Sequence, residues 1–309
     1  MTAECPAVLC LAGPTGAGKT ALALRLAQEL GCEVVNADSR QVYRDFPLVT
    51  AQPSPEERAV CPHHLYGFLR TEESVDAAAW ARLALAKIQD IRARGLTPLL
   101  VGGTGFYFQT LLRGIASIPQ VPASIHEAVL ARMEKAGPEA LHRELAKADP
   151  AYAARIHPRD RQRTARALEV LEATGRPFSW WHANAEGAPL CRGPLLVAQT
   201  TLGELEPRLM ARIEAMLAAG ALEEGKAAMQ ACGDGQAPGW TGIGCREIYG
   251  FLTGRMGLAE MKAAWFRATR QYAKRQLTWF RGRSESVWID LARPDEAAAL
   301  ARRLLEALR

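Results

Sequence analysis

Residues 13–20 have the side-chain types and spacing of an anion-binding loop. Their sequence, GPTGAGKT, matches the P-loop pattern G-x-x-x-x-G-K-[ST]. In such a loop, successive backbone N–H groups and the start of the following helix bind a phosphate chain, and the lysine neutralises its charge. We expect the hydroxyl of the last residue to hold Mg²⁺. The pattern predicts a pyrophosphate site, without specifying a nucleotide, made by Gly13, Pro14, Thr15, Gly16, Ala17, Gly18, Lys19 and Thr20.

Two further polar residues follow short apolar runs. Asp38 comes directly after residues 34–37, and Thr104 comes after residues 99–101 and two glycines. Because ligands bind outside the carboxyl ends of parallel strands, we expect both residues to lie beside the P-loop. Asp38 could act as a general base, hold Mg²⁺ or simply cap the next turn. Thr104 could present its hydroxyl to a substrate or cap the helix that follows.

The elements that would position these residues alternate between strand and helix. A helix is predicted directly after the P-loop and another over residues 76–94, where Gly95 ends it. Short buried strands alternating with helices are typical of a parallel sheet covered on both faces. We therefore predict an α/β, P-loop NTPase-like fold with a parallel sheet flanked by helices. Its strands are predicted by the apolar runs at residues 7–12, 34–37, 99–101, 195–201 and 287–291.

A change in composition after residue 120 predicts a second unit. A long stretch rich in alanine, arginine and glutamate begins there and shows no strand-like pattern. We expect an inserted all-helical subdomain at residues 121–190, and a core made of residues 1–120 and 191–309. The adjacent residues His63 and His64 lack the spacing of metal ligands, so we place them in a loop.

The overall composition is that of a globular protein. Of the 309 residues, 49% are hydrophobic and 23% are charged, which excludes a disordered or collagen-like chain. No apolar run reaches the roughly 18 to 20 residues that span a bilayer, and no signal peptide is recognisable. We therefore expect a cytoplasmic protein with no membrane partner. The seven cysteines are scattered and include no C-x-x-C pair, which predicts reduced thiols.

The distribution of charge is more informative than its total. The net charge is only +5, but residues 262–283 contain seven basic residues, no acidic residue and several aromatic ones. We expect these basic residues to be spread around a helix rather than confined to one stripe. Such a segment can bind a phosphate backbone while its aromatic and amide side chains contact bases or sugars. A second arginine-rich stretch, at residues 155–176, could equally be a solvated helix face.

Seven motifs, in order along nearly the whole chain, resemble those of the bacterial tRNA dimethylallyltransferase family, which prenylates an adenosine next to the anticodon. They are GPTGAGKT at Gly13, DSRQVYR at Asp38, PHHL at Pro62, VGGTGFY at Val101, HPRDRQRTARALEV at His157, GIGCREI at Gly242 and TRQYAKRQLTWFR at Thr269. The sequence differs from the family pattern at Gln52, where a lysine is usual, and at Cys245, where a tyrosine is common. Both differences concern details of loop or RNA contacts.

The resemblance implies a substrate for each site. The P-loop would hold the pyrophosphate of dimethylallyl diphosphate, with Lys19 and Mg²⁺ stabilising the leaving group. Asp38 would be the general base on the exocyclic N6 of adenine, with Thr104 near the reacting centre. The helical insertion would close over the anticodon stem-loop of tRNA, and the enzyme would act as a monomer. The tRNA contacts would be Asp38, Ser39, Arg40, Gln41, Gln162, Arg163, Thr164, Ala165, Arg166, Thr241, Gly242, Ile243, Gly244, Cys245, Arg246, Lys274, Arg275, Gln276, Leu277, Thr278, Trp279, Phe280 and Arg281.

Two other functions are compatible with parts of the sequence. A P-loop kinase that phosphorylates a small molecule with ATP explains the first 120 residues equally well. It leaves the basic and aromatic segment at residues 262–283 without a role. An RNA-binding NTPase would use that segment, but it has no use for a general base at Asp38 separate from metal binding.

Overall fold

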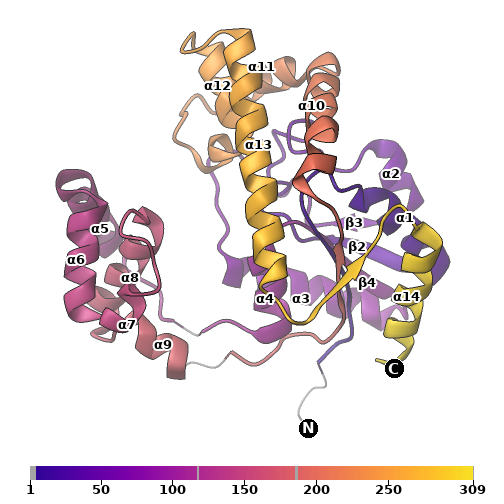
Figure 1. Ribbon diagram of the computed structural model, residues 1–309, viewed down its shortest axis with the longest axis horizontal. Coiled ribbons are helices and arrows are strands. Elements are labelled where there is room, and N and C mark those ends of the chain that lie inside the picture. The colour runs from indigo at the N-terminus through magenta and orange to yellow at the C-terminus, as the bar shows by residue number, and fades with distance from the viewer. Residues whose placement is uncertain (1–4, 117, 185–186, 309) are drawn as a thin grey trace. The chain divides into compact units, whose positions relative to one another are not determined.

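The computed structural model describes residues 5–116, 118–184 and 187–308. The chain forms two compact units, one made of Met1–Leu112 with Pro189–Arg309 and the other of Arg113–Ala188 (Figure 1). The second unit thus begins and ends slightly earlier than the insertion at 121–190 that composition predicts. The two ends of the second unit lie close together, because a Cβ at Gly114 would be only 2.2 Å from the carbonyl oxygen of Gly187.

The first unit contains a parallel sheet of six strands in the order β3-β2-β4-β1-β5-β6. The predicted parallel sheet is therefore confirmed. The placement of His63 and His64 in a loop is wrong, because they form a short edge strand that pairs with Val34 and Val35. The strands are β1 (Leu9–Ala12), β2 (Cys32–Asn36), β3 (His63–His64), β4 (Thr97–Gly102), β5 (Leu195–Ala198) and β6 (Ser286–Ile289).

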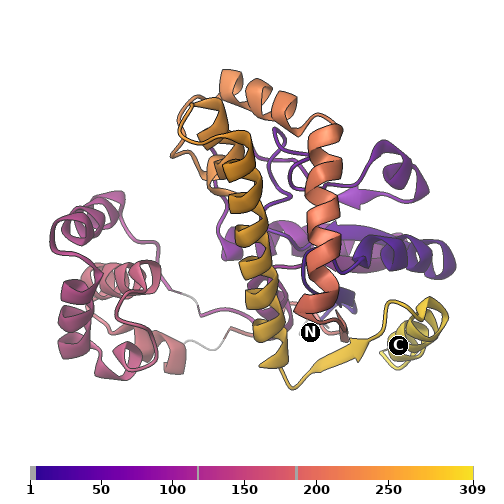
Figure 2. The ribbon, with the colours of Figure 1, turned by 45° about the horizontal axis from the view of Figure 1, so that its top comes forward.

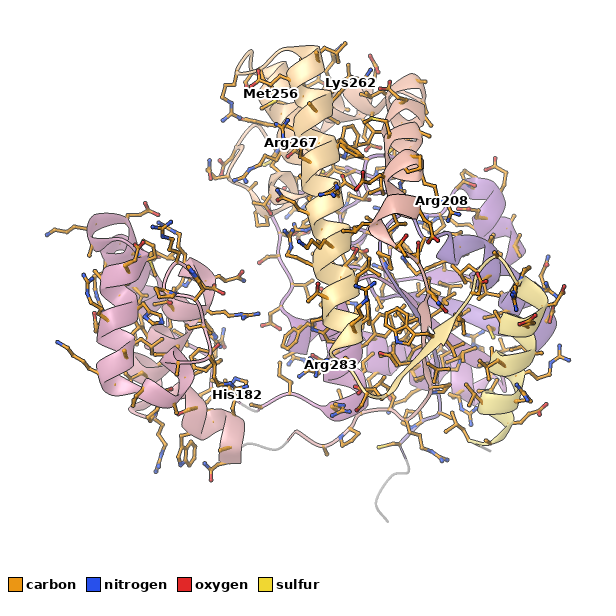
Figure 3. The ribbon with its side chains drawn as sticks, in the orientation of Figure 1. His182, Arg208, Met256, Lys262, Arg267 and Arg283 are labelled. Carbon is orange, nitrogen blue, oxygen red and sulfur yellow. The ribbon has the colours of Figure 1, made fainter. Side chains whose placement is uncertain are left out.

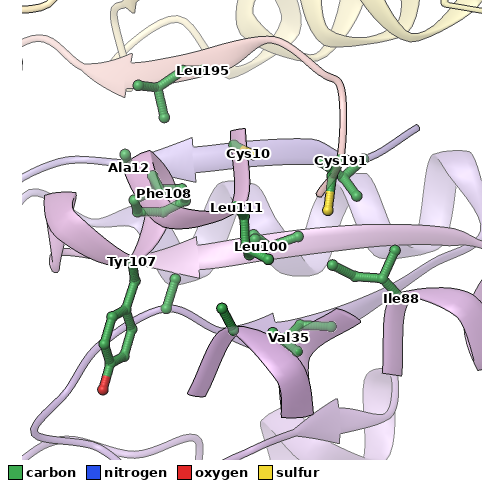
Figure 4. Packing of buried hydrophobic residues seen from close by; sticks show 14 of the residues in the cluster. Cys10, Ala12, Val35, Ile88, Leu100, Tyr107, Phe108, Leu111, Cys191 and Leu195 are labelled. Atoms are coloured by element: carbon green, nitrogen blue, oxygen red, sulfur yellow. The ribbon is translucent and has the colours of Figure 1, made fainter. Parts of the chain in front are cut away.

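Alternate residues of each central strand bury against opposite layers of helices. Cys10, Val35 and Leu100 face a cluster that includes side chains of α3 (Ala77–Ala93) and α4 (Gly105–Arg113), shown in Figure 4. Leu9 and Leu99 face the other side, against α1 (Lys19–Leu30) and α14 (Pro294–Glu306). Both faces of the sheet are covered, so the central strands are mostly apolar, with Glu33 and Asn36 as buried polar residues of β2.

Helices between β5 and β6 form a separate layer above the carboxyl ends of the strands. The long helices α10 (Leu202–Ala218) and α13 (Leu258–Arg281) lie side by side in Figures 1 and 2. Between them come α11 (Ala221–Ala231), the 3₁₀ turn η1 (Pro238–Thr241) and α12 (Cys245–Leu252). These elements pack with residues 42–51 around Phe46 and Trp240. A short helix, α2 (Pro55–Val60), precedes β3.

Among the described residues of the second unit, all the regular elements are helices, as the composition predicts. Its core is formed by Val129, Leu145, Leu168 and neighbouring apolar side chains. Asp149 and Asp160 cap two of its helices by accepting hydrogen bonds from backbone N–H groups. The helices are α5 (Ala123–Ala136), α6 (Pro138–Ala148), α7 (Pro150–Ala153), α8 (Arg161–Thr174) and α9 (Phe178–Asn184).

All seven cysteines are unpaired, as predicted. Within the described parts of the chain, no helix combines the length and the apolar character that crossing a membrane requires.

Candidate active site

The P-loop joins β1 to α1 and surrounds the start of that helix. Gly18, with φ of +91°, precedes the helix and supplies no side-chain cap, so the first N–H groups of α1 remain available to an anion. Gly13 must be glycine because a Cβ there would lie 2.8 Å from the Cβ of Ala198 on β5. The loop thus has the geometry of the phosphate cradle that its sequence predicts.

Lys19 lies within this loop. Its Nζ atom donates to the carbonyl oxygens of Gly13 and Pro14 at 3.0 and 2.9 Å. Burial lowers the pKa of Lys19 to about 8, while the carboxylate of Asp38 acts in the opposite direction and Arg212 acts in the same direction as burial. The ammonium is therefore poorly solvated, and a bound anion would stabilise it.

Asp38 is held at the carboxyl end of β2 by its neighbours. Its backbone N–H donates to the fully buried side chain of Asn36 at 2.8 Å, and Asn36 in turn donates to the Asp38 carbonyl at 3.0 Å. The Oδ1 atom of Asp38 accepts the backbone N–H of Arg40 at 2.9 Å. One carboxylate oxygen is thus used for orientation, and the other is available for chemistry.

Thr104 connects the glycine loop after β4 to the segment that follows Asp38. Its Oγ1 accepts the backbone N–H of Ser39 at 2.9 Å and donates to the Ser39 hydroxyl at 3.2 Å. The Thr104 N–H donates to the carbonyl of Ala37 at 3.1 Å. Of the two roles open to the Thr104 hydroxyl, these contacts disfavour a helix cap, because the side chain faces Ser39 rather than its own helix.

Two cavities meet at Asp38. The first has about 710 Å³ of empty space and is lined by the P-loop, Lys19 and Tyr66. The second has about 590 Å³ and more apolar walls, which include Ile213 and Trp265. Four residues line both cavities and so mark their junction: Thr15, Asp38, Thr50 and Arg212.

Arg212 is a site residue that the sequence analysis missed, and Tyr272 was expected only as one of the aromatic residues of segment 262–283 that could contact bases or sugars. Arg212 comes from α10, and burial lowers its pKa, while the Asp38 carboxylate acts in the opposite direction. Tyr272 comes from α13, and burial followed by the Asp38 carboxylate raises its pKa. One sequence feature could have indicated Arg212: its helix, α10, follows directly after β5, and the carboxyl ends of parallel strands share one edge.

The segment that carries Thr50 is fixed by two side chains. Glu224 of α11 accepts the N–H groups of Leu48 and Val49 at 2.7 and 2.9 Å, and burial raises its pKa. Gln41 donates to the carbonyls of Thr50 and Ala51 at 3.1 and 2.5 Å. Gln41 was expected to contact tRNA, but its amide nitrogen is engaged in holding the wall of the first cavity.

The sequence matches two protein-family models. The family model described as IPP transferase matches residues 41–283, and the model described as Isopentenyl transferase matches residues 6–62. The chain belongs to the IPP transferase family. It is 58% identical over 295 residues to a tRNA dimethylallyltransferase of Desulfovibrio desulfuricans, covering 96% of this chain and 90% of that one. It is 44% identical over 298 residues to one of Rhodopseudomonas palustris, covering 95% and 92%.

Solved structures of the family have the same fold. The full-length tRNA isopentenylpyrophosphate transferase of Bacillus halodurans aligns with a TM-score of 0.70 at 32% identity, covering 98% of both chains. A eukaryotic dimethylallyltransferase acting on tRNA aligns with a TM-score of 0.79 at 30% identity, covering 92% of this chain and 74% of that one. The P-loop-like α/β fold predicted from sequence is therefore confirmed.

The residues expected to contact tRNA fall into three groups according to their exposure. Some have exposed side chains: Gln162, Arg163, Arg166, Thr241, Arg246, Lys274, Arg275, Thr278 and Arg281. Asp38, Ser39, Arg40, Ile243 and Trp279 are half-buried. Others are buried and present little surface to RNA in this structure: Thr164, Ala165, Gly242, Gly244, Cys245, Gln276, Leu277 and Phe280. Their contact with tRNA stays a prediction.

The long basic helix α13 also differs from expectation. Its apolar residues form one buried face that includes Met261, Trp265 and Phe280, so the charges lie on the remaining surface and do not surround the helix. Two of the cations, Lys262 and Arg270, pair with glutamates of α10 at 2.7 and 2.6 Å. Figure 3 shows Lys262 and Arg267 toward one end of this helix and Arg283 just beyond the other. A count of charges within residues 262–283 does not include these glutamates of α10, because they lie in a distant part of the sequence.

Proposed function

We propose that this protein transfers the dimethylallyl group of dimethylallyl diphosphate to N6 of the adenosine adjacent to the anticodon in tRNA. The observation that carries the proposal is the junction of two cavities at Asp38, one lined by a P-loop and the other by apolar and aromatic walls. Membership of the IPP transferase family supplies the class of reaction.

The first cavity is assigned to the diphosphate. Backbone N–H groups of the P-loop and the start of α1 face it, and Lys19 and Arg212 supply positive charge. As the allylic C–O bond breaks, its electron pair leaves with pyrophosphate, whose growing charge these groups stabilise. The clamp is organised before the reaction, because Lys19 is already fixed by two carbonyl oxygens.

The second cavity is assigned to the adenine. A base stacked in an RNA loop cannot reach a buried allylic carbon, so the adenosine must be flipped out into the protein. Trp265 and Tyr272 provide aromatic surface for it. The N6 lone pair forms the new C–N bond, and the N6 proton passes to Asp38 at the junction.

Mg²⁺ is proposed as the metal of this reaction. Within the described residues, no group of three or more His, Cys, Asp or Glu side chains could hold an ion. Thr20 and Asp38 line the same cavity, which offers one hydroxyl and one carboxylate. That small donor set fits Mg²⁺, which prefers substrate phosphate oxygens, waters and few protein ligands. Thr20 would hold the ion, which would neutralise charge on the diphosphate.

The RNA is assigned to the exposed cations. In the core, these are the outward-facing side chains of α13 such as Lys274 and Arg275, together with Arg246, and we add the half-buried Arg40 of the sequence motif at Asp38. In the helical unit, Arg163 and Arg166 of α8 are exposed beside Gln162. We retain the proposals that the helical unit closes on the anticodon stem-loop, that the enzyme is a monomer and that it acts in the cytoplasm.

The test is to incubate the purified protein with dimethylallyl diphosphate and unmodified tRNA, followed by mass spectrometry of the anticodon loop. We expect one added five-carbon unit on one adenosine and release of pyrophosphate. A parallel incubation with ATP and no isoprenoid tests the kinase alternative. Unmodified RNA together with brisk ATP turnover would refute the proposed function.

A further inference from the structure

Gln276 is a buried polar residue that connects three parts of the active site. It lies on α13, is only 5% exposed and was expected to contact tRNA. Its Oε1 atom instead accepts the backbone N–H of Thr15 in the P-loop at 3.0 Å. Its Nε2 atom donates to the carbonyl of Gly103, next to Thr104, at 2.9 Å. One side chain thus joins the P-loop, the Thr104 loop and the basic helix.

The contact between α13 and the Thr104 loop is close. A Cβ at Gly103 would lie 2.0 Å from Nε2 of Gln276, and a Cβ at Gly105 would lie 2.3 Å from the Trp279 ring. Gln276 and Trp279 are three residues apart and so share a helix face. Because glycines alone permit this approach, a displacement of α13 must move the loop or break the hydrogen bonds.

The same helical turns present their cations to solvent. Lys274 and Arg275 immediately precede Gln276, and both are exposed. Within the contacts described for the chain, neither forms an ion pair. Leu277 and Phe280 lie on the inner face of the helix and are buried in the core. There Phe280 packs edge-on against Phe108 of α4, with the two ring centroids 6.3 Å apart. The helix therefore carries an RNA-facing surface and a P-loop contact on one rigid element.

We infer that Gln276 is a positioning residue that couples RNA binding on α13 to diphosphate binding at the P-loop. The inference rests on the proposed function for the identity of the two ligands. When RNA fixes α13, Gln276 holds the Thr15 N–H and the Gly103 carbonyl in the arrangement that accepts the diphosphate. By linkage, diphosphate must strengthen RNA binding by the same factor.

The experiment measures the affinity of inorganic pyrophosphate by calorimetry, with and without a saturating anticodon stem-loop RNA. For the wild-type protein we expect RNA to lower the pyrophosphate Kd about five-fold or more. The measured quantity is the ratio of the pyrophosphate Kd without RNA to the Kd with RNA. In Gln276→Met, which keeps the length of the side chain but removes both hydrogen bonds, we expect this ratio to fall to about one. The control, Gln230→Met, changes an exposed glutamine of α11 and should keep the wild-type ratio.

A second variant tests the same contact without altering Gln276. Gly103→Ala places a methyl group against Nε2 of Gln276 and should also lower the ratio of the two Kd values to about one. Thermal unfolding checks that this variant is folded. A wild-type ratio of one overturns the inference, as does a full ratio in both variants. Equal weakening of pyrophosphate binding with and without RNA would show a structural role only. Prenyl transfer by the wild-type protein is assayed separately, so a failure of the proposed function can be distinguished from a failure of this inference.

Discussion

The lowered pKa of Lys19 predicts how diphosphate binding depends on pH. Only the protonated amine neutralises the ligand, so binding should weaken as pH rises through the pKa of about 8 in the free protein. With one titrating group, about nine-tenths of the molecules carry the charge at pH 7 and about one-tenth at pH 9. The Kd for dimethylallyl diphosphate should therefore rise about ten-fold between pH 7 and pH 9. An unperturbed lysine, with a pKa near 10.5, would show almost no change over this range.

The assay is a calorimetric titration of dimethylallyl diphosphate in the absence of RNA, at constant ionic strength. Lys19→Arg keeps the charge at every pH tested, because guanidinium does not deprotonate in this range, so its affinity should be lower but independent of pH. Lys226→Arg, on the exposed surface of α11, should reproduce the wild-type curve. A Kd that stays constant from pH 7 to 9 in the wild-type protein would refute the argument that burial of Lys19 controls the site.

Three further perturbations test other parts of the structure. Asp38→Asn should lower kcat for prenyl transfer by about 10²–10⁴-fold with an unchanged Kd for RNA, measured by single-turnover kinetics and filter binding; near-normal turnover would exclude Asp38 as the base. Lys274→Ala and Arg275→Ala should each reduce the slope of log K against log salt for tRNA by about one, and an unchanged slope would contradict their contact with phosphates. Glu33→Gln should lower the unfolding free energy by about 1–2 kcal/mol at pH 7 in urea titrations, a value reduced because Arg94 is partly exposed. Hydrogen bonds from Arg94 and His64 hold the pKa of Glu33 at about 2, so its contribution is complete above pH 4.5 and is lost toward pH 2; a difference that persists there would contradict this assignment.

Local patterns were sufficient for the parts of the protein that depend on neighbouring residues. The P-loop, Asp38 and Thr104 were all predicted as site residues from short motifs, because each follows a strand whose apolar run is visible in the sequence. The parallel sheet followed from the alternation of these runs with helices. The short strand β3 was missed because two residues carry no periodic pattern, and its pairing with Val34 and Val35 decides its structure.

The motif at residues 274–281 illustrates where local patterns mislead. It contains both exposed cations and buried residues, and the family resemblance made no distinction between them. Lys274 and Arg275 face solvent, whereas Leu277 and Phe280 fill the core. Which face of α13 is covered depends on α10 and the sheet, which lie far away in the sequence.

The amino-acid order alone determined the P-loop motif, the class of fold and the family, because these depend on residues within a few positions of one another or on motifs in a fixed order. Only the folded chain decided that Arg212 reaches the junction of the cavities, that Glu224 fixes the Thr50 segment and that Gln276 joins the P-loop to the basic helix. The two hydrogen bonds of Gln276 span 261 and 173 residues. Contacts over such separations arise from the packing of whole helices against the sheet, and no spacing within a single motif encodes them.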